Sequence, residues 1–415
     1  MSRVQTSRAN RYGPALGSGT RGSRSVLSRM ASNTVSTFSS AVATIIGKII
    51  IGPTPPSIYD RLIKQDALLV DPSGGLEIVH QYDSTGDGQV TIVKSKDSGA
   101  CFARKLTPQT RLDSHNTSSW DFGPWKKPNE VHILEVSRLK DHPHPRILSF
   151  TALRHDTQGQ YVLWSSFCAG GNLAEQIDFW RERRRTELPH QFFLHILVQA
   201  FEAMAFLHSG LRYASNGKYY RDGDHKTIVH GDLKAENIFL GWSSENIGGM
   251  PDLVVGDFGT SIVEGHPGAR VMAGTLPYNA PEIKAIYGDN PIDEDHVDLY
   301  FEAGAAKTPS ADIYSIGVLL YMIAAKERIS NDRDPLLADR DLSELRISRD
   351  YEIEGLKDFI VKCLQVDPSK RATADYDEQT GIMTAVDTFR DMRDLLITRN
   401  PALGPTDWLH PQTVR

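Results

Sequence analysis

The chain contains 415 residues, of which 40% are hydrophobic and 24% are charged, and its net charge at pH 7 is −6. These proportions are ordinary for a soluble globular protein, and the charge excludes the strongly basic surface of a nucleic-acid-binding protein. We therefore expect no nucleic-acid partner. We also expect no transmembrane segment, because no uninterrupted apolar run reaches the ~18 residues that span a bilayer. The three cysteines, Cys101, Cys168 and Cys363, stand far apart, which argues against a disulfide framework and a zinc site.

The N-terminal segment is basic and rich in serine. Its first 59 residues contain arginine and lysine but no acidic residue. We predict that residues 1–57 form a disordered tail and linker, because this composition buries too little apolar surface to offset the entropy lost on ordering. The same composition is typical of a mitochondrial import signal, and residues 25–51 could form a helix with one apolar side. We therefore expect a cytoplasmic or nuclear protein, with mitochondrial import as the alternative.

From residue 79 the chain has the periodicities of a folded domain, which we predict to extend over residues 79–397, before a C-terminal tail over 398–415. Residues 89–106 contain two β-rich runs joined by a polar turn, which predicts a hairpin. The spacing of apolar residues further along predicts a helix, a strand and two long helices, over 128–139, 159–167, 192–209 and 312–325. This order predicts an α+β fold with a small β-rich lobe followed by a larger α-helical lobe.

Three short motifs contain the residue types that phosphoryl transfer requires. They are "FARK" (102–105), "HGDLKAEN" (230–237) and "VVGDFG" (254–259). Phosphoryl transfer needs a cation for the nucleotide phosphates, oxygen ligands for magnesium and a carboxylate beside the acceptor hydroxyl. The motifs together supply all of these groups, so they predict a nucleotide-dependent phosphotransferase.

In this order the motifs resemble those of the eukaryotic protein kinases, over roughly residues 79–397. "AGTLPYNAPE" (273–282) resembles the end of an activation segment, and Asp312 matches the aspartate that opens the central buried helix of that family. Arg371 matches the arginine that pairs with the A-P-E glutamate, here Glu282. Small-molecule kinases of the aminoglycoside phosphotransferase type share the H-G-D sequence but lack these later motifs, so they are the weaker alternative. The resemblance implies a two-lobed kinase fold that binds ATP and Mg²⁺.

The resemblance also implies a role for each residue of the catalytic motifs. Asp232 would accept or orient the proton of the acceptor hydroxyl, and Lys234 would neutralise the transferred phosphate. Asn237 and Asp257 would supply oxygen ligands to Mg²⁺. Thr275 would bridge Asp232 and Lys234 through its hydroxyl, as in serine/threonine kinases.

The nucleotide would lie between the lobes. Lys105 would bind the α- and β-phosphates and form a salt bridge with Glu130 of the following helix. Ala103 and Val90 would cover the adenine, and backbone groups of Ser166 and Cys168 in "SSFCAGGNL" (165–173) would bind its edge.

The glycine-rich loop departs from the family pattern. In one register Val90 covers adenine, and only Gly88 of "DSTGDGQV" (83–90) stands at a glycine position. In a second register Gly86 and Gly88 form the first glycine pair, and Val93 is the cover. In both registers backbone amides would approach the phosphates, beside an aspartate of unfavourable charge.

Gly231 stands where protein kinases usually carry an arginine that binds a phosphorylated activation segment. The second half of the segment 260–274 contains no serine or threonine. We therefore hypothesise that activity does not require phosphorylation of this segment. Residues 211–227, about 239–252 and about 285–308 exceed the family minimum, and we predict that they form surface loops available for docking.

These observations predict a serine/threonine protein kinase that transfers the γ-phosphate of ATP to protein hydroxyl groups. The alternative is a pseudokinase that acts as a nucleotide-binding or scaffold module, which the degenerate loop and Gly231 favour. The retained Lys105, Glu130, Asp232 and Asp257 oppose that alternative. Neither the protein substrate nor the pathway follows from the sequence.

Overall fold

The fold is taken from a computed structural model, which describes residues 49–51, 76–82, 89–96, 98–106, 128–137, 139, 143–155, 161–184, 187–214, 218–242, 247–265, 271–293, 295–327 and 341–409. All of them belong to one compact unit, Val42–Arg415. The predicted N-terminal tail up to residue 48, and the loop with Gly86 and Gly88, lie outside the described residues.

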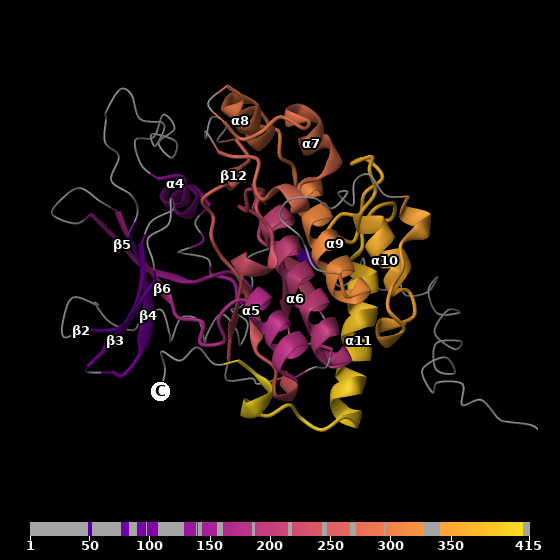
Figure 1. The fold of residues 1–415 in the computed structure, drawn as a ribbon, viewed down its shortest axis with the longest axis horizontal. Helices are drawn as coiled ribbons and strands as arrows, with labels where there is room; N and C mark the ends of the chain where they lie inside the picture. The colour runs from indigo at the N-terminus through magenta and orange to yellow at the C-terminus, as the bar shows by residue number, and fades with distance from the viewer. Residues whose placement is uncertain are drawn as a thin grey trace, which may run out of the picture. The chain divides into compact units, whose positions relative to one another are not determined.

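The first lobe is a five-stranded antiparallel sheet with the strand order β2-β3-β4-β6-β5. Its strands are β2 (Leu76–Gln81), β3 (Gln89–Ser95), β4 (Cys101–Leu106), β5 (Phe150–His155) and β6 (Tyr161–Ser166). The predicted hairpin over 89–106 is confirmed as β3 and β4, and the predicted strand over 159–167 as β6. Helix α4 (Asn129–Val136) confirms the predicted helix and lies beside the sheet (Figure 1).

The second lobe is mainly helical, and its helices are α5 (Leu173–Asp178), α6 (His190–Ser209), α7 (Pro281–Tyr287), α8 (Val297–Ala305), α9 (Pro309–Ala325), α10 (Leu356–Cys363) and α11 (Met383–Arg399). A π-helical turn follows α5 over Phe179–Arg184. Short strands line this lobe: β9 (Ile228–Val229) pairs with β12 (Ile262–Val263), and β10 (Ile238–Gly241) pairs with β11 (Asp252–Val255). The α+β architecture with two lobes is therefore confirmed.

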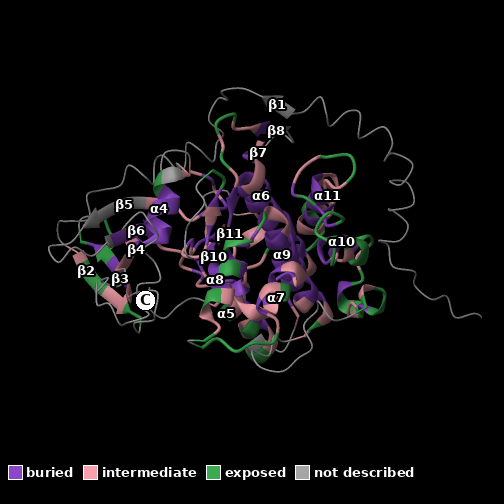
Figure 2. Cartoon of the chain, turned by 90° about the horizontal axis from the view of Figure 1, so that it is seen from above, coloured by how far each residue is buried: buried purple, intermediate pink, exposed green. Residues whose placement is uncertain are grey.

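The two central helices begin and end at residues suited to those positions. Proline precedes the first residue of α6 and occupies the first position of α9, where the absent N–H has no intrahelical partner to lose. α9 ends at Ala325, and the capping residue Lys326 takes a left-handed φ of 61°. Because nearly every residue of α9 between these ends is buried, it forms the centre of the lobe, as its uniformly apolar sequence predicts (Figure 2).

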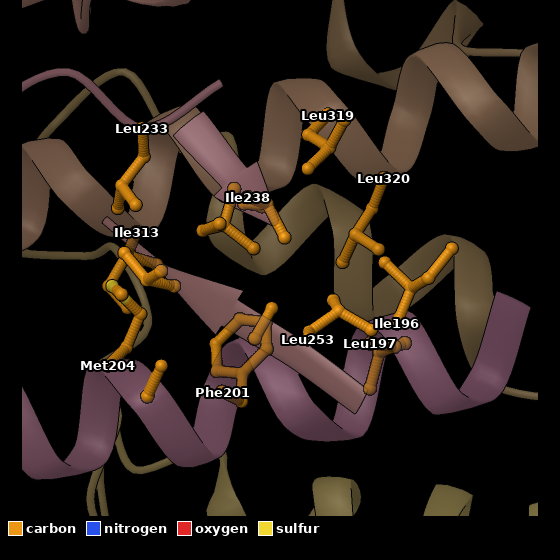
Figure 3. Packing of buried hydrophobic residues seen from close by; sticks show 14 of the residues in the cluster. Ile196, Leu197, Phe201, Met204, Leu233, Ile238, Leu253, Ile313, Leu319 and Leu320 are labelled. Atoms are coloured by element: carbon orange, nitrogen blue, oxygen red, sulfur yellow. The ribbon is translucent and has the colours of Figure 1, made fainter. Parts of the chain in front are cut away.

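Apolar side chains from α6 and α9 enclose β10 and β11, the strands that adjoin the motifs at 230–237 and 254–259. Figure 3 shows Ile238 of β10 and Leu253 of β11 between Phe201 of α6 and Leu319 of α9. These side chains are at most 2% exposed. Burial of each such side chain stabilises the fold by roughly 1.5–3 kcal/mol, so the loop over residues 230–237 is anchored on a closely packed core.

The segments predicted to be surface loops are ordered parts of the lobe where they are described. β7 (Leu211–Ala214) and β8 (Lys218–Arg221) form a hairpin, and β1 (Ile49–Ile51) pairs with β8 in parallel. Leu211 and Tyr219 are buried, as are Tyr300 and Phe301 of α8. The surface-loop prediction is therefore wrong for these elements, since large apolar residues within the polar stretches anchor them. Ile49–Ile51 also form a strand and not the end of a helix.

The residues that follow α11 return to the lobe. Trp408 is 3% exposed, and its ring packs against those of Phe192 and Trp180 at centroid distances of 4.7 and 6.2 Å. Its indole N–H donates to the Gly249 carbonyl at 2.9 Å, and Leu409 N–H donates to Gln176 at 3.1 Å. The beginning of the predicted C-terminal tail therefore covers the start of α6.

One helix among the described residues, α6, has the length and hydropathy of a membrane span, and the strongly bent pair of α8 and α9 is a second candidate by the same measure. However, 89% of the apolar window of α6 is buried inside the protein. α6 is therefore the core helix of the lobe.

Candidate functional site

A chain of ion pairs connects the two lobes. Lys105 Nζ on β4 lies 2.8 Å from Glu130 Oε2 on α4, so the predicted salt bridge is present. The same Nζ lies 3.2 Å from Asp257 Oδ1, which follows β11 in the second lobe. Asp257 has a φ of +63°, in the left-handed region that non-glycine residues seldom adopt. The backbone strain thus occurs at the residue whose carboxylate faces Lys105.

Burial and charge act in opposite directions on these groups. Burial alone would lower the pKa of Lys105, but the carboxylates of Glu130 and Asp257 outweigh it and raise the pKa. Burial would likewise raise the pKa of Asp257, but the Lys105 ammonium lowers it. Both groups are therefore charged at neutral pH, as phosphate binding and metal binding require.

The second cluster forms on the catalytic loop before β10. Asn237 Nδ2 donates to the carbonyl and to Oδ2 of Asp232, at 2.8 and 3.2 Å. Lys234 Nζ lies 3.0 Å from Asp232 Oδ2 and donates to Thr275 Oγ1 at 2.7 Å. The predicted bridge through Thr275 is present: its hydroxyl contacts Lys234 and also hydrogen-bonds Asp232, and its backbone N–H adds a contact with Asp232 Oδ1 at 2.7 Å.

Asp232 remains ionised in this cluster. Burial would raise the pKa of its carboxyl group, but the charge of Lys234 and the hydrogen bonds from Thr275 and Lys234 lower it. A carboxylate held by a backbone N–H and an ammonium has a fixed orientation. It can therefore accept a hydrogen bond from an acceptor hydroxyl placed beside it.

Asp312 anchors the loop over residues 230–237 through hydrogen bonds to its backbone. The carboxylate, on α9, accepts the backbone N–H groups of His230 and Gly231, each at 2.8 Å, and lies 3.0 Å from His208 Nε2. The ring of His230 lies 2.9 Å from the Gly256 carbonyl, next to Asp257. These contacts couple the two motifs through buried hydrogen bonds.

The predicted pairing of Arg371 with Glu282 is also present. The guanidinium donates to both carboxylate oxygens, at 2.7 and 2.8 Å, and Arg371 is 1% exposed. It also donates to the Ser310 carbonyl at 2.9 Å, at the beginning of α9. The end of the activation segment is therefore attached to the central helix.

Between the lobes lies a cavity of about 300 Å³. Val90, Ala103 and Lys105 of the sheet line it, together with Ser166 and Cys168 of the connection between the lobes. The structure thus brings together the predicted nucleotide-binding residues that it describes. A nucleotide base fits a cavity of this volume, which falls at the lower end of the usual range for ligand sites.

The structure separates the two registers of the glycine-rich loop. Val90 and Ile92 line the cavity, whereas Val93 belongs to an apolar cluster with Phe102 and Trp164. Side chains alternate along a strand, so Val93 cannot face the cavity when Val90 does. The second register, with Val93 as the cover, is therefore wrong.

Sequence reasoning missed the aromatic residues that line the cavity, which are Tyr82, Phe150, Phe167 and Phe239. Phe239 comes from β10, two residues after Asn237, and Tyr82 comes from the end of β2. Phe239 stands only two residues after the predicted site residue Asn237, and this closeness along the chain was a usable signal. Tyr82 gave no such signal, since its position depends on the pairing of β2 with β3.

The described residues also fit magnesium. No group of three or more histidine, cysteine or acidic side chains among them forms a closed metal cage. Mg²⁺ is commonly bound by one or two protein oxygens together with substrate phosphates, so a cage is not required. Because the amide nitrogen of Asn237 donates to Asp232, its oxygen is the atom available to a cation. Asp257 adds a carboxylate, and the pair therefore suits a magnesium ion that the nucleotide phosphates also bind.

The fold and the site define a two-lobed protein with the arrangement of a nucleotide-dependent phosphotransferase. Comparison with known families agrees with this class: the family described as "Protein kinase domain" matches residues 84–380. The chain therefore belongs to the protein kinase family.

Individual relatives are similar at modest identity. G2-specific protein kinase nimA of Emericella nidulans is 26% identical over 312 residues, which cover 71% of this chain and 39% of the relative. Serine/threonine-protein kinase kin-29 of Caenorhabditis elegans is 30% identical over 308 residues, covering 72% of this chain and 30% of the relative. Meiosis-specific serine/threonine-protein kinase mek1 of Schizosaccharomyces pombe is 21% identical, with 69% and 54% covered. The chain thus spans about half or less of the length of these relatives.

Proposed function

We propose that the protein is a serine/threonine protein kinase that transfers the γ-phosphate of ATP to protein hydroxyl groups. The observation that carries this proposal is the position of Lys105 Nζ, within 3.2 Å of both Glu130 and Asp257 across the two lobes. This contact sets the lysine tip at the end of the cavity where the nucleotide phosphates would lie. The names of the relatives support the same activity, since they are serine/threonine kinases.

Each residue of the site has a distinct task in the proposed reaction. Lys105 binds the α- and β-phosphates, while Asn237 and Asp257 hold the magnesium ion. When bound, magnesium neutralises charge on the phosphate oxygens. Asp232 orients the acceptor hydroxyl through its ionised carboxylate, and Lys234 offsets the charge of the transferred group.

The connection between the lobes holds the adenine in this proposal. Ser166 N–H donates to the Ser149 carbonyl at 3.0 Å, so an adenine contact from Ser166 has to use its carbonyl. The Cys168 carbonyl accepts from Gly171 N–H at 3.2 Å, so we assign the contact of Cys168 with the base to its N–H. Val90 and Ala103 cover one face of the base, and Phe239 supports the other.

Preference for serine and threonine acceptors is supported by the contact of Lys234 with Thr275. This contact places a lysine and a threonine beside Asp232, where the acceptor would lie. The pseudokinase alternative is less favoured, because the residues that phosphoryl transfer needs are retained and paired. Lys105 contacts Glu130 and Asp257, and Asp232 contacts Lys234.

Transfer of labelled phosphate from Mg·ATP to a generic protein substrate tests the proposal. We expect label on serine or threonine, and we expect Asp232→Asn to abolish it. The matched control is Asp358→Asn on α10, where the carboxylate is exposed and far along the chain from the site. Transfer that survives the Asp232 substitution would show that the site is wrongly assigned. Binding of Mg·ATP without transfer would favour the pseudokinase.

We also propose that the protein acts in the cytoplasm or nucleus, with mitochondrial import through the basic N-terminal segment as the alternative. Sequencing of the mature N-terminus from cells separates the two. An intact N-terminus supports the first location, whereas removal of the basic segment supports import.

A further inference from the structure

The space next to Gly231 is occupied by a lysine from another element. Gly231 has a φ of +77°, and a Cβ atom built on it would lie 2.7 Å from both Cδ and Nζ of Lys307. Lys307, in the turn between α8 and α9, is 5% exposed. Protein kinases usually carry an arginine at the position of Gly231. Here that position has no side chain, and the side chain of Lys307 occupies the space beside it.

Lys307 connects the two ends of the activation segment. Its Nζ donates to the Met272 carbonyl at 2.7 Å and approaches the Thr260 carbonyl at 3.4 Å. Thr260 follows the D-F-G motif directly, whereas Met272 precedes the Thr275 contact with Asp232 by three residues. A single ammonium group therefore holds both ends of the segment near the catalytic loop.

The backbone of the segment is packed closely at the same place. A Cβ atom on Gly304 of α8 would lie 1.9 Å from the Val271 carbonyl, so the helix and the segment touch through their backbones. Only glycine permits this approach. The lysine contact and the glycine contact fix residues 271 and 272 from the same side.

The hydroxyl groups of the segment are already engaged. Ser261 is fully buried, and its Oγ donates to the His230 carbonyl at 2.8 Å, which Thr260 Oγ1 also approaches at 3.4 Å. Residues 262–274 contain no serine or threonine. Ser261 is therefore inaccessible and Thr260 is half-buried beside the D-F-G motif, while the stretch 262–274 around Met272 holds no hydroxyl whose phosphorylation could take over the role of Lys307.

We propose that Lys307 is a positioning residue that holds residues 271–275 against the catalytic loop, so that the acceptor site is assembled without phosphorylation of the segment. This inference rests on the proposed kinase function and names a means of regulation for the same site. Gly231 and Lys307 form a matched pair, because a side chain at 231 would collide with Lys307. Burial lowers the pKa of Lys307 to about 8, although the carboxylates of Asp232 and Asp312 act in the opposite direction. The amine therefore stays mainly charged at pH 7 and can donate hydrogen bonds to the segment.

The test compares Lys307→Met with Lys326→Met in the full chain. Lys307 lies just before α9, whereas Lys326 directly follows the helix at its other end, where it bridges Glu187 and Asp350 on the surface. We expect Lys307→Met to lower kcat by between about 10-fold and 100-fold, as misplacement of reacting groups by about 1 Å does. KM for ATP should change by less than about two-fold, because Lys307 does not line the cavity. Phosphatase treatment of the unsubstituted protein should leave its activity unchanged.

Hydrogen exchange supplies a readout that does not depend on activity. We expect the backbone amides of residues 271–275 to exchange faster in Lys307→Met, while those of β10 and β11 keep their rates. If the methionine variant has a lowered melting temperature, Lys307→Gln, which retains a hydrogen-bond donor, replaces it in both measurements. Kinetics and exchange that match those of Lys326→Met, or loss of wild-type activity on phosphatase treatment, would overturn the inference. Failure of the kinase proposal is distinguishable, since an unsubstituted protein that transfers no phosphate still reports the Lys307 contact through exchange.

Discussion

Replacement of Asp312 by asparagine tests how the catalytic loop is held. The carboxylate accepts backbone N–H groups from His230 and Gly231 and contacts His208, while Asp312 itself is 1% exposed. Asparagine has almost the same shape but only one acceptor oxygen. Its amide nitrogen would face one of the two N–H donors, so that donor would be buried without a partner.

The magnitude follows from these contacts. An unsatisfied buried donor costs about 1–3 kcal/mol, and hydrogen bonds to a charged acceptor are worth about 1.5–3 kcal/mol each. One lost bond of this kind, together with the weaker bonds to a neutral oxygen, gives a loss of about 3 kcal/mol in the free energy of unfolding. Because His230 and Gly231 precede Asp232 directly, the same change should displace the catalytic carboxylate and lower kcat about 100-fold.

Urea unfolding followed by tryptophan fluorescence measures the first effect, and the phosphate-transfer assay measures the second. Asp358→Asn is the matched control, because its carboxylate is exposed and should change stability by less than about 0.5 kcal/mol. An Asp312→Asn protein with the same urea midpoint and the same kcat as the control would refute the reasoning. A lowered midpoint with unchanged kcat would refute only the link from this anchor to the catalytic loop.

Three further substitutions give separate expectations. Arg371→Met should lower the free energy of unfolding by about 3 kcal/mol, since it leaves the Glu282 carboxylate without its partner, and a reduced urea midpoint measures this. Lys105→Met should abolish the rise in melting temperature that Mg·ATP causes, as followed by calorimetry, and a rise equal to that of the unsubstituted protein would contradict the phosphate-binding role. The folded pKa of Lys307 is about 8 and the unfolded value about 10.4, so between these pH values the unfolded state binds more protons and stability rises with pH. Lys307→Met should remove up to about 3 kcal/mol of this rise, measured as the difference in urea midpoints between the two proteins from pH 8 to 10.5.

Much of the site was predictable from the sequence because its residues lie in short local motifs. The spacing within "HGDLKAEN" places Asp232, Lys234 and Asn237 on one loop, and the structure brings them into contact. The pairing of Lys105 with Glu130 was also predictable, since a strand followed by a helix limits where the partner can stand.

The remaining features depend on contacts between segments far apart in the chain. Lys307 lies 76 residues after Gly231, and nothing in its own neighbourhood indicates that the turn before α9 reaches the activation segment. The sequence of β7 and β8 predicts a loop because most of its residues are polar, although Leu211 and Tyr219 are buried in the structure. In both cases tertiary packing, and not local pattern, determines the structure.

The position of Trp408 has a practical consequence for protein production. A fragment cut at the limits of the family match, after residue 380, would lack all of α11 and the tryptophan. Even a fragment ending at residue 397 would uncover Phe192, which is fully buried, and the neighbouring Trp180. Exposed aromatic patches of this kind promote aggregation, so a soluble fragment should retain the chain at least to Leu409.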